Sequence, residues 1–362
     1  RWAIFEPIWR RACHTGYAQV SRRVLKKFYG ESELSLEALY RMREKLPDYE
    51  DEALFDSVLG EAGIAVRLMD SCGNPGVLKG VFSGDLKLPP RARMVIPLPG
   101  YHAIRCAQDA ALCMHPVDQW PGSLDDYLAG CRTIFERHKA QGAVAFKDQS
   151  AYSRTLAYTN PTRAEAEEIF NWFMADHRRA AAYPDGVKPL DDYLFHQFMR
   201  MAREMELPVQ VHTGHMAGIR NEITKTNAVQ MSSVFELHPE VKFDLFHANW
   251  PYSGELLFLA KNYPNVHIDL CWANIIDPIY CQNLLKQAVS AVPHGKIHGY
   301  GSDFGGNPDG AWAHASIARD NIAIALADLV EMEYMSLDEA KEVARSWMFD
   351  NANSFFKLNV QG

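Results

Sequence analysis

Two histidines stand at equivalent places in the sequence, each at the end of a short apolar run. His212 ends the run VQVH and precedes TGH, and His247 ends DLFH and precedes ANWPY. Imidazole is the commonest metal ligand in proteins, so a pair of this kind indicates a metal site. Taken singly, each histidine could equally be a strand-end residue that is hydrogen-bonded to backbone. The shared position of the two residues favours the metal site.

A carboxylate, Asp303, completes the pattern. It lies in YGSDFGG, after another apolar run and before the glycine pair Gly305 and Gly306. Two imidazoles and one carboxylate can hold a zinc-type ion and leave one position open for water. Asp303 would also take the proton from the metal-bound water, first as general base and then as general acid. The plainer interpretation is a turn aspartate, which is common.

Lys147 ends the run GAVAFK and is predicted to be buried. Burial of an ammonium group shifts its pKa or requires a partner, so such a lysine is rarely inert. It could hold a substrate carboxylate, form a Schiff base, or be carboxylated and bridge two metal ions. A lysine that extends to solvent at a strand end is the plainer alternative. HxxH on a loop is not the HExxH helix of metalloproteases, so His215 is predicted either to support the neighbouring ligand or to contact substrate.

The elements that must position these residues are strands in alternation with helices. Seven apolar runs are predicted strands, at residues 63–70, 93–100, 142–149, 207–214, 241–249, 266–273 and 296–304. Amphipathic helices are predicted at 123–142, 162–181, 189–208, 254–264, 283–293 and 336–356. This alternation, without a Gly-rich or Ser-rich boundary, favours one α/β domain over 1–362, a (β/α)₈ TIM barrel preceded by a mostly helical segment at 1–60. A doubly wound sheet is less favoured, because no GxGxxG follows the first strand.

The composition excludes several classes of function. A net charge of −8 and a pI near 6.0 do not favour nucleic acid or an anionic membrane as partner. No apolar run reaches the ~18–20 residues that span a bilayer. Seven scattered cysteines without a CxxC pair predict a reduced, cytoplasmic chain. The expected partner is a small-molecule substrate, and the helical N-terminal segment adds the expectation of a homo-oligomer.

The order of these motifs resembles the amidohydrolase superfamily, and within it the amidohydrolase-related proteins of the nodulin and FluG type. Lys147 in FKDQSAYSR, His212 in VHTG, His247 in LFHANWPY and Asp303 in GSDFGG follow in the family's order. The resemblance implies a metal-dependent barrel with a divalent ion, most often zinc, at its mouth. It implies that His212, His247 and Asp303 are the ligands, or that His247 instead hydrogen-bonds the metal-bound water.

The chain departs from this family at one point. Family members carry an HxH pair on their first strand, which supplies two ligands, but none of the fourteen histidines here forms an HxH. The run at 63–70 is therefore expected to be the second barrel strand, with the first strand upstream of Arg1. The alternative is a degenerate site with too few ligands for tight zinc binding.

The expected activity is hydrolysis of an amide, ester or lactone in a small anionic substrate by metal-activated water. The expected catalytic residues are Asp303, His247 and Lys147. Substrate contacts are expected from Lys147, Tyr152, Arg154, His215 and Trp250. The same site would also serve non-oxidative decarboxylation or sugar-acid isomerisation, and the residues do not separate these reactions. A degenerate barrel without catalysis is the remaining alternative.

Overall fold

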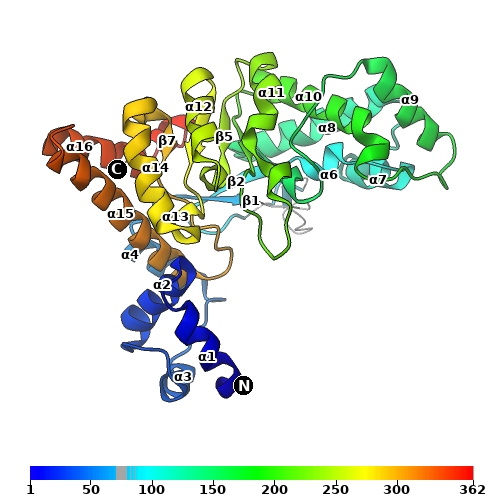
Figure 1. The fold of residues 1–362 in the computed structure, drawn as a ribbon. Coiled ribbons are helices and arrows are strands. Elements are labelled where there is room, and N and C mark those ends of the chain that lie inside the picture. Colours follow the sequence, from blue (N-terminus) through cyan, green and yellow to red (C-terminus); the bar gives the residue numbers. More distant parts are fainter. Residues whose placement is uncertain (71–79, 82, 86, 362) are drawn as a thin grey trace.

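Each of the seven expected strand segments corresponds to one strand of the structure. The computed structural model describes residues 1–361 apart from 71–79, 82 and 86 (Figure 1). Its strands are β1 (Arg67–Asp70), β2 (Ala92–Pro97), β3 (Ala145–Asp148), β4 (Val209–Val211), β5 (Phe243–Leu245), β6 (Val266–Asp269) and β7 (Ile297–His298). Each strand pairs in parallel with the next strand in the chain, in the order β1-β2-β3-β4-β5-β6-β7.

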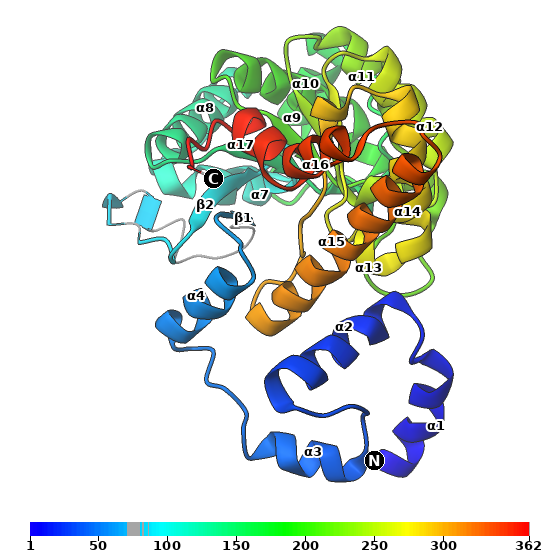
Figure 2. The same ribbon diagram turned by 90° about the vertical axis from the view of Figure 1, so that its left-hand side faces the viewer.

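Helices fill the connections and pack around the curled sheet (Figure 1 and Figure 2); short 3₁₀ and π helices carry the label η. Between β2 and β3 lie α6 (Pro99–His102), α7 (Ala107–Met114), η2 (His115–Val117) and α8 (Leu124–Ala140). Between β3 and β4 lie η3 (Ser150–Tyr152), α9 (Arg163–Met174), η4 (Asp185–Val187) and α10 (Lys188–Glu204). The side chains of Ser123 and Thr162 cap α8 and α9, as their positions in the sequence indicate.

The second half of the chain repeats this pattern. After β4 come η5 (Ile223–Thr226), η6 (Ala228–Met231) and α11 (Ser232–Leu237), and after β5 come η7 (Phe246–Asn249) and α12 (Ser253–Asn262). After β6 come α13 (Ala273–Ile276), α14 (Pro278–Ala291) and η8 (His294–Lys296). After β7 come α15 (Pro308–Glu331), α16 (Leu337–Arg345), η9 (Ser346–Asp350) and α17 (Asn351–Phe355). The long helix α15 is not among the helices expected from the sequence.

The sheet is curled but open, because β1 and β7 each pair with one neighbour among the described strands. C-terminal residues cover the outer edge of β7. There the Gly299 N–H donates to the Trp347 carbonyl at 2.7 Å. The Asn351 amide likewise donates to the Ile297 carbonyl at 2.8 Å. The described residues thus provide seven strands, where a closed barrel has eight. A cavity of about 430 Å³ lies inside the curled sheet and is lined by residues of β1 and β7, among others.

The two faces of the sheet differ in polarity. Outward residues such as Val209 and Leu245 are fully buried under the helices. The alternate residues Gln210 and Asp244 point inward, and their side chains lie 3.5 Å apart. At the amino ends of the strands the interior is closed by an apolar cluster of Val95, Ala145, Phe355 and Phe356. The interior therefore has an apolar base and a polar upper part, where a site can form.

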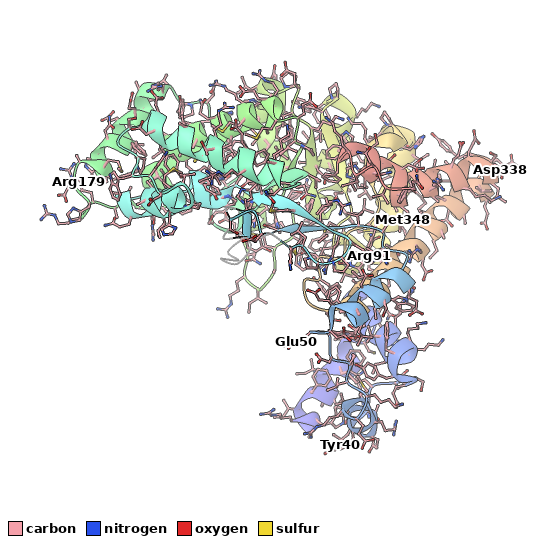
Figure 3. The ribbon with its side chains drawn as sticks, turned by 180° about the vertical axis from the view of Figure 1, so that it is seen from behind. Tyr40, Glu50, Arg91, Arg179, Asp338 and Met348 are labelled. Carbon is pink, nitrogen blue, oxygen red and sulfur yellow. The ribbon has the colours of Figure 1, made fainter. Side chains whose placement is uncertain are left out.

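The segment before β1 is helical and projects from the body formed by the sheet and its helices (Figure 1 and Figure 2). It contains α1 (Trp2–Ala12), α2 (Gly16–Val24), η1 (Leu25–Tyr29), α3 (Leu36–Arg43) and α4 (Glu52–Glu61). Figure 3 shows Tyr40 and Glu50 on this projection, seen from behind. Helix α1 has no buried residue, whereas α2 packs against α13 and α15.

Two further observations concern the chain as a whole. In the part of the chain that the structure describes, none of the helices is both long and apolar enough to cross a membrane. The six described cysteines are free thiols, and Cys72 lies outside the described residues.

Candidate active site

The side chains of His212 and His247 meet at the carboxyl ends of β4 and β5. His212 Nδ1 lies 3.1 Å from His247 Nε2, and the ring centroids are 4.4 Å apart. Burial, with the nearby charge of Lys147, lowers the pKa of His212 to about 3. Burial and the neighbouring His212 ring hold the pKa of His247 well below its ordinary value. Both imidazoles are therefore neutral at neutral pH.

Two backbone carbonyls determine which nitrogen of each ring carries the proton. His212 Nε2 lies 2.8 Å from the His215 carbonyl, and His247 Nδ1 lies 2.8 Å from the Cys271 carbonyl. A carbonyl only accepts, so each of these nitrogens holds the single proton of its neutral ring. His212 Nδ1 and His247 Nε2 then direct lone pairs toward each other. This arrangement becomes favourable when a cation lies between the two nitrogens.

The backbone after β5 takes a conformation that L-residues rarely adopt. His247, Ala248 and Asn249 have φ values of 62°, 50° and 48°, in the left-handed region. Such residues cost about 1–3 kcal/mol each and cluster at functional sites. The Asn249 side chain holds the turn by accepting from the Ala228 N–H at 3.0 Å. The strained turn directs the His247 ring toward His212.

Gly214 joins the loop after His212 to this turn. Its φ is +64°, and a Cβ there would lie 2.5 Å from backbone atoms of Asn249 and Trp250. We expect Gly214→Ala to lower the free energy of unfolding by about 2–4 kcal/mol in urea denaturation, because left-handed strain and a backbone clash add up. Gly218→Ala is the matched control, since Gly218 has φ +92° and no neighbour within 4 Å of its Cβ position. An equal loss in the free energy of unfolding in both variants would show that the close approach of Gly214 to Asn249 and Trp250 is unimportant.

Lys147 enters the interior from the end of β3 and is buried, as its place in the sequence indicates. Its Nζ lies 3.0 Å from the centroid of the Phe246 ring. Burial lowers the pKa of Lys147, and the charges of Asp303 and Asp70 are among those that oppose this shift. An ammonium over an aromatic face inside a cavity is suited to hold an anionic group of a substrate.

Asp303 lies at the rim of the cavity, in an exposed turn after β7 with φ 58°. Partial loss of hydration raises the pKa of Asp303, and Lys147 opposes this rise. The ligand atoms of Asp303, His212 and His247 do not all lie within 4.8 Å of one another. The structure thus brings together two of the three predicted metal ligands and leaves the carboxylate at the rim.

The sequence analysis missed a second polar group, formed by Asp244, Asp269 and His298 in the interior. Among the described residues it is the one set of three whose ligand atoms lie within 4.8 Å of one another. His298 Nδ1 lies 2.9 Å from Asp244 and 4.0 Å from Asp269. Burial and the adjacent Asp244 raise the pKa of Asp269 well above its ordinary value, whereas His298, against the effect of burial, holds the pKa of Asp244 low. Polar residues inside the predicted strands were the signal for this group.

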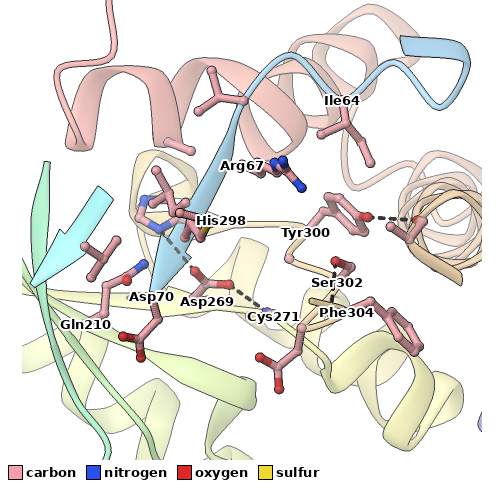
Figure 4. A pocket seen from close by; sticks show the side chains of 18 of the residues that line it. Ile64, Arg67, Asp70, Gln210, Asp269, Cys271, His298, Tyr300, Ser302 and Phe304 are labelled. Carbon is pink, nitrogen blue, oxygen red and sulfur yellow. Dashed lines mark hydrogen bonds and ion pairs between the residues drawn. The ribbon is translucent and has the colours of Figure 1, made fainter. Parts of the chain in front are cut away.

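Asp269 and His298 face a cavity of about 430 Å³ (Figure 4), whereas Asp244, His212 and His247 are not among the residues that line it. Its polar lining includes Arg67, Asp70, Lys147, Gln210, Asp269, His298, Tyr300, Ser302 and Asp303. Figure 4 shows Asp269 and His298 side by side on the wall formed by β6 and β7. One buried ammonium group and several carboxylates in a partly apolar cavity are typical of a site for a small polar ligand.

Three more of the predicted residues surround the histidine pair. The Tyr152 ring lies 4.6 Å from the His212 ring. The His215 ring lies between Trp250, at 5.6 Å, and Trp272, at 4.8 Å. Tyr152 and His215 therefore lie beside the histidine pair, and Trp250 lies beside His215.

Arg154 does not reach this site, in contrast to the expectation of a substrate contact. Its guanidinium is buried and forms ion pairs with Asp191 at 2.9 Å and Asp192 at 2.5 Å. These two buried carboxylates already balance the charge of the guanidinium. Arg154 therefore serves to anchor the loop after β3.

His102 belongs to the same buried charged group. Its Nδ1 lies 2.5 Å from Asp191 and its Nε2 lies 3.4 Å from Asp148. Burial alone would lower the pKa of His102, but the two carboxylates raise it to about 9. Because the unfolded pKa is about 6.5, this stabilisation is complete below pH 6.5 and is lost as the pH rises through 9.

The free energy of unfolding should therefore fall by about 3 kcal/mol between pH 6.5 and pH 9.5. Urea denaturation at a series of pH values measures this slope. A His102→Gln variant should be less stable at pH 6.5 and should lack most of the slope. The same slope in both proteins would show that another group is responsible.

The spacing of the histidine pair fits a metal ion. Two nitrogens that each lie about 2.0–2.1 Å from a zinc ion, at bond angles between 90° and tetrahedral, are about 2.9–3.4 Å apart. The distance of 3.1 Å between His212 Nδ1 and His247 Nε2 falls in this range. Two nitrogen ligands are too few for tight binding on their own, so the pair fits as part of a ligand set.

Comparisons with known proteins agree with this picture. The sequence profile of the amidohydrolase family matches residues 178–358, half of the 362 residues. Protein fluG of Emericella nidulans is 26% identical over 229 residues, which cover 60% of this chain and 26% of fluG, so the chain spans about a quarter of that relative.

Two solved structures share the fold. Glucuronate isomerase from Caulobacter crescentus has a TM-score of 0.76 at 17% identity, with 100% of this chain and 79% of that chain covered. A provisionally assigned metal-dependent hydrolase from Lactobacillus casei ATCC 334 has a TM-score of 0.72 at 17% identity, with 96% and 86% covered. At these identities the likeness concerns the fold alone, which is the α/β fold of TIM-barrel enzymes.

The resemblance inferred from four short motifs is therefore confirmed at the level of the family. The matched region contains His212, His247 and Asp303 and begins after Lys147. The strand order, the inward polar residues and the position of the histidines at the carboxyl ends of strands are those of a barrel enzyme. The chain belongs to the amidohydrolase family.

Proposed function

We propose that this chain is a metal-dependent hydrolase that uses metal-activated water to cleave an amide, ester or lactone bond in a small anionic substrate. The observation that carries this proposal is the histidine pair. The unprotonated nitrogens of His212 and His247 face each other at 3.1 Å, with their tautomers fixed by backbone carbonyls. Family membership supports an enzyme of this fold and leaves the reaction open.

Each residue would have a distinct role in the reaction. His212 and His247 would hold the divalent ion. Zinc is the expected ion, because it binds imidazole nitrogens well. When bound, the ion would supply a water that ionises near neutral pH. Asp303, at the rim of the cavity, would act first as general base and then as general acid toward the leaving group, a role that its raised pKa favours. Lys147 binds the anionic group of the substrate inside the cavity.

Isomerisation of a sugar acid is the second candidate. The likeness in fold to glucuronate isomerase supports it. So does the raised pKa of Asp269, because a protonated acid beside His298 could move a proton between neighbouring carbons. In non-oxidative decarboxylation, Lys147 would bind the substrate carboxylate in the same way. The experiment therefore also measures decarboxylation.

A substrate screen on the zinc-loaded full chain tests the proposal. It should include lactones, N-acyl amino acids, aromatic carboxylates and D-glucuronate. Hydrolysis that stops on chelation and falls about 10²–10⁴-fold in Asp303→Asn would support the hydrolase. Ketose formation from D-glucuronate or release of CO₂ without hydrolysis would instead support the alternative reactions. Absence of turnover on every substrate would favour a degenerate barrel.

A further inference from the structure

The helical segment before β1 reaches the active site through α2. Val20 of α2 is buried in a cluster with Ile275, Ala313 and Ile317, against which Trp272 and Phe304 pack. Gly16 lies so close to α13 that a Cβ would be 2.1 Å from the Ile275 carbonyl oxygen. Figure 1 and Figure 2 show α2 beside α13 and the first turns of α15. The segment is thus docked on the two loops that carry Trp272 and Asp303.

This docking places Tyr17, the residue after Gly16, against Trp272. The two ring centroids lie 6.3 Å apart at an interplanar angle of 75°. Trp272 in turn lies 5.3 Å from the His247 ring and 4.8 Å from the His215 ring. A continuous set of aromatic contacts therefore runs from the N-terminal helices to the histidine pair.

The side chain of Tyr17 is partly buried beside Trp272. Partial burial raises the pKa of Tyr17 to about 12; the hydrogen bond to Trp272 opposes this rise, and the charges of Asp303 and Tyr152 add to it. Tyr17 and Tyr152 remain 45% and 50% exposed.

Docking of the segment does not require the ring of Tyr17. The close backbone contact of Gly16 and the burial of Val20 already hold α2 in place. A half-exposed tyrosine beside Trp272, at the mouth of a barrel, is instead suited to contact a bound molecule.

We propose that Tyr17 is a specificity-determining residue and that, with Trp272, it forms a wall that stacks against the ring of a ring-bearing carboxylate. The proposal rests on the proposed function, because it takes the carboxylate to be held by Lys147. Aromatic side chains stack on aromatic rings and on the C–H faces of sugars through the same dispersion contacts. Aromatic acids and sugar acids therefore share this chemistry, and the experiment separates them.

Isothermal titration calorimetry of the zinc-loaded full chain with benzoate, D-glucuronate and acetate tests the wall. Tyr17→Ala should weaken binding of at least one ring-bearing probe by about 5–10-fold, and Tyr17→Phe by about twofold, while acetate binding stays unchanged. The probe that responds identifies the type of ring. Tyr40→Ala is the matched control, because Tyr40 is an exposed tyrosine on α3 of the same segment.

Equal dissociation constants for wild type and Tyr17→Ala would overturn the inference. So would a wild type that binds both ring-bearing probes no more tightly than it binds acetate. Failure of the proposed function has a different signature. Metal-dependent hydrolysis that is lost in Asp303→Asn would uphold the hydrolase whatever Tyr17 does. Ring-selective binding that depends on Tyr17, in a chain without metal-dependent hydrolysis, would uphold the wall and contradict the hydrolase.

Discussion

His247→Ala should reduce the metal-dependent kcat/KM by about 10³-fold or more. The variant removes one of the two nitrogens that face each other at 3.1 Å, and a single imidazole cannot hold a divalent ion at this site. Turnover of the best substrate from the screen, at saturating zinc, measures the loss. His294→Ala is the control, since His294 is an exposed histidine on η8.

A buried histidine also contributes to packing, so circular dichroism and thermal unfolding must show that His247→Ala is folded. His247→Gln provides a second variant that keeps more of the volume and removes the imidazole. Metal-dependent turnover within about tenfold of wild type in both folded variants would contradict the role of this pair. The reaction would then have to use another group, such as Asp269 with His298.

Arg154→Met should lower the free energy of unfolding by about 3–5 kcal/mol. The substitution leaves Asp191 and Asp192 buried without the guanidinium that pairs with both. Urea denaturation of the wild type and the variant gives the difference. Arg163→Met is the control, because the pair of Arg163 with Asp125 is 47% and 65% exposed and should contribute little to stability.

A stable Arg154→Met variant would instead support the sequence-based expectation that Arg154 binds substrate. If Arg154→Met keeps its stability and raises KM for an anionic substrate, Arg154 binds substrate in the working enzyme. The buried ion pairs would then describe only the ligand-free arrangement.

Much of the fold was predictable because local patterns determine it. Runs of Val, Ile, Leu and Phe identified all seven strands, since parallel strands are buried on both faces. Caps such as Ser123 and Thr162 marked helix starts through their own hydrogen bonds. The meeting of His212 and His247 was predictable because strand ends of a parallel sheet share one edge.

The remaining features depend on contacts between distant residues. Arg154 pairs with two aspartates on a helix well after it in the chain, and nothing in its own surroundings in the sequence indicates this. Asp244 and His298 lie within strands predicted from their apolar neighbours, and only the curl of the sheet brings their side chains to 2.9 Å. Asp303 follows β7, as its position in the sequence indicates, but no local pattern predicts its left-handed backbone, with φ 58°, or its place at the rim.

The central claim is that the metal ion lies between His212 and His247, and metal-binding stoichiometry tests it most directly. Zinc bound in equilibrium with excess zinc, measured by mass spectrometry, should fall from about one equivalent in the wild type to background in the double variant His212→Ala, His247→Ala. It should remain near the wild-type value in Asp244→Asn, which disrupts the rival group of Asp244, Asp269 and His298. Zinc retained by the double variant and lost from Asp244→Asn would contradict the account and place the ion deeper in the barrel.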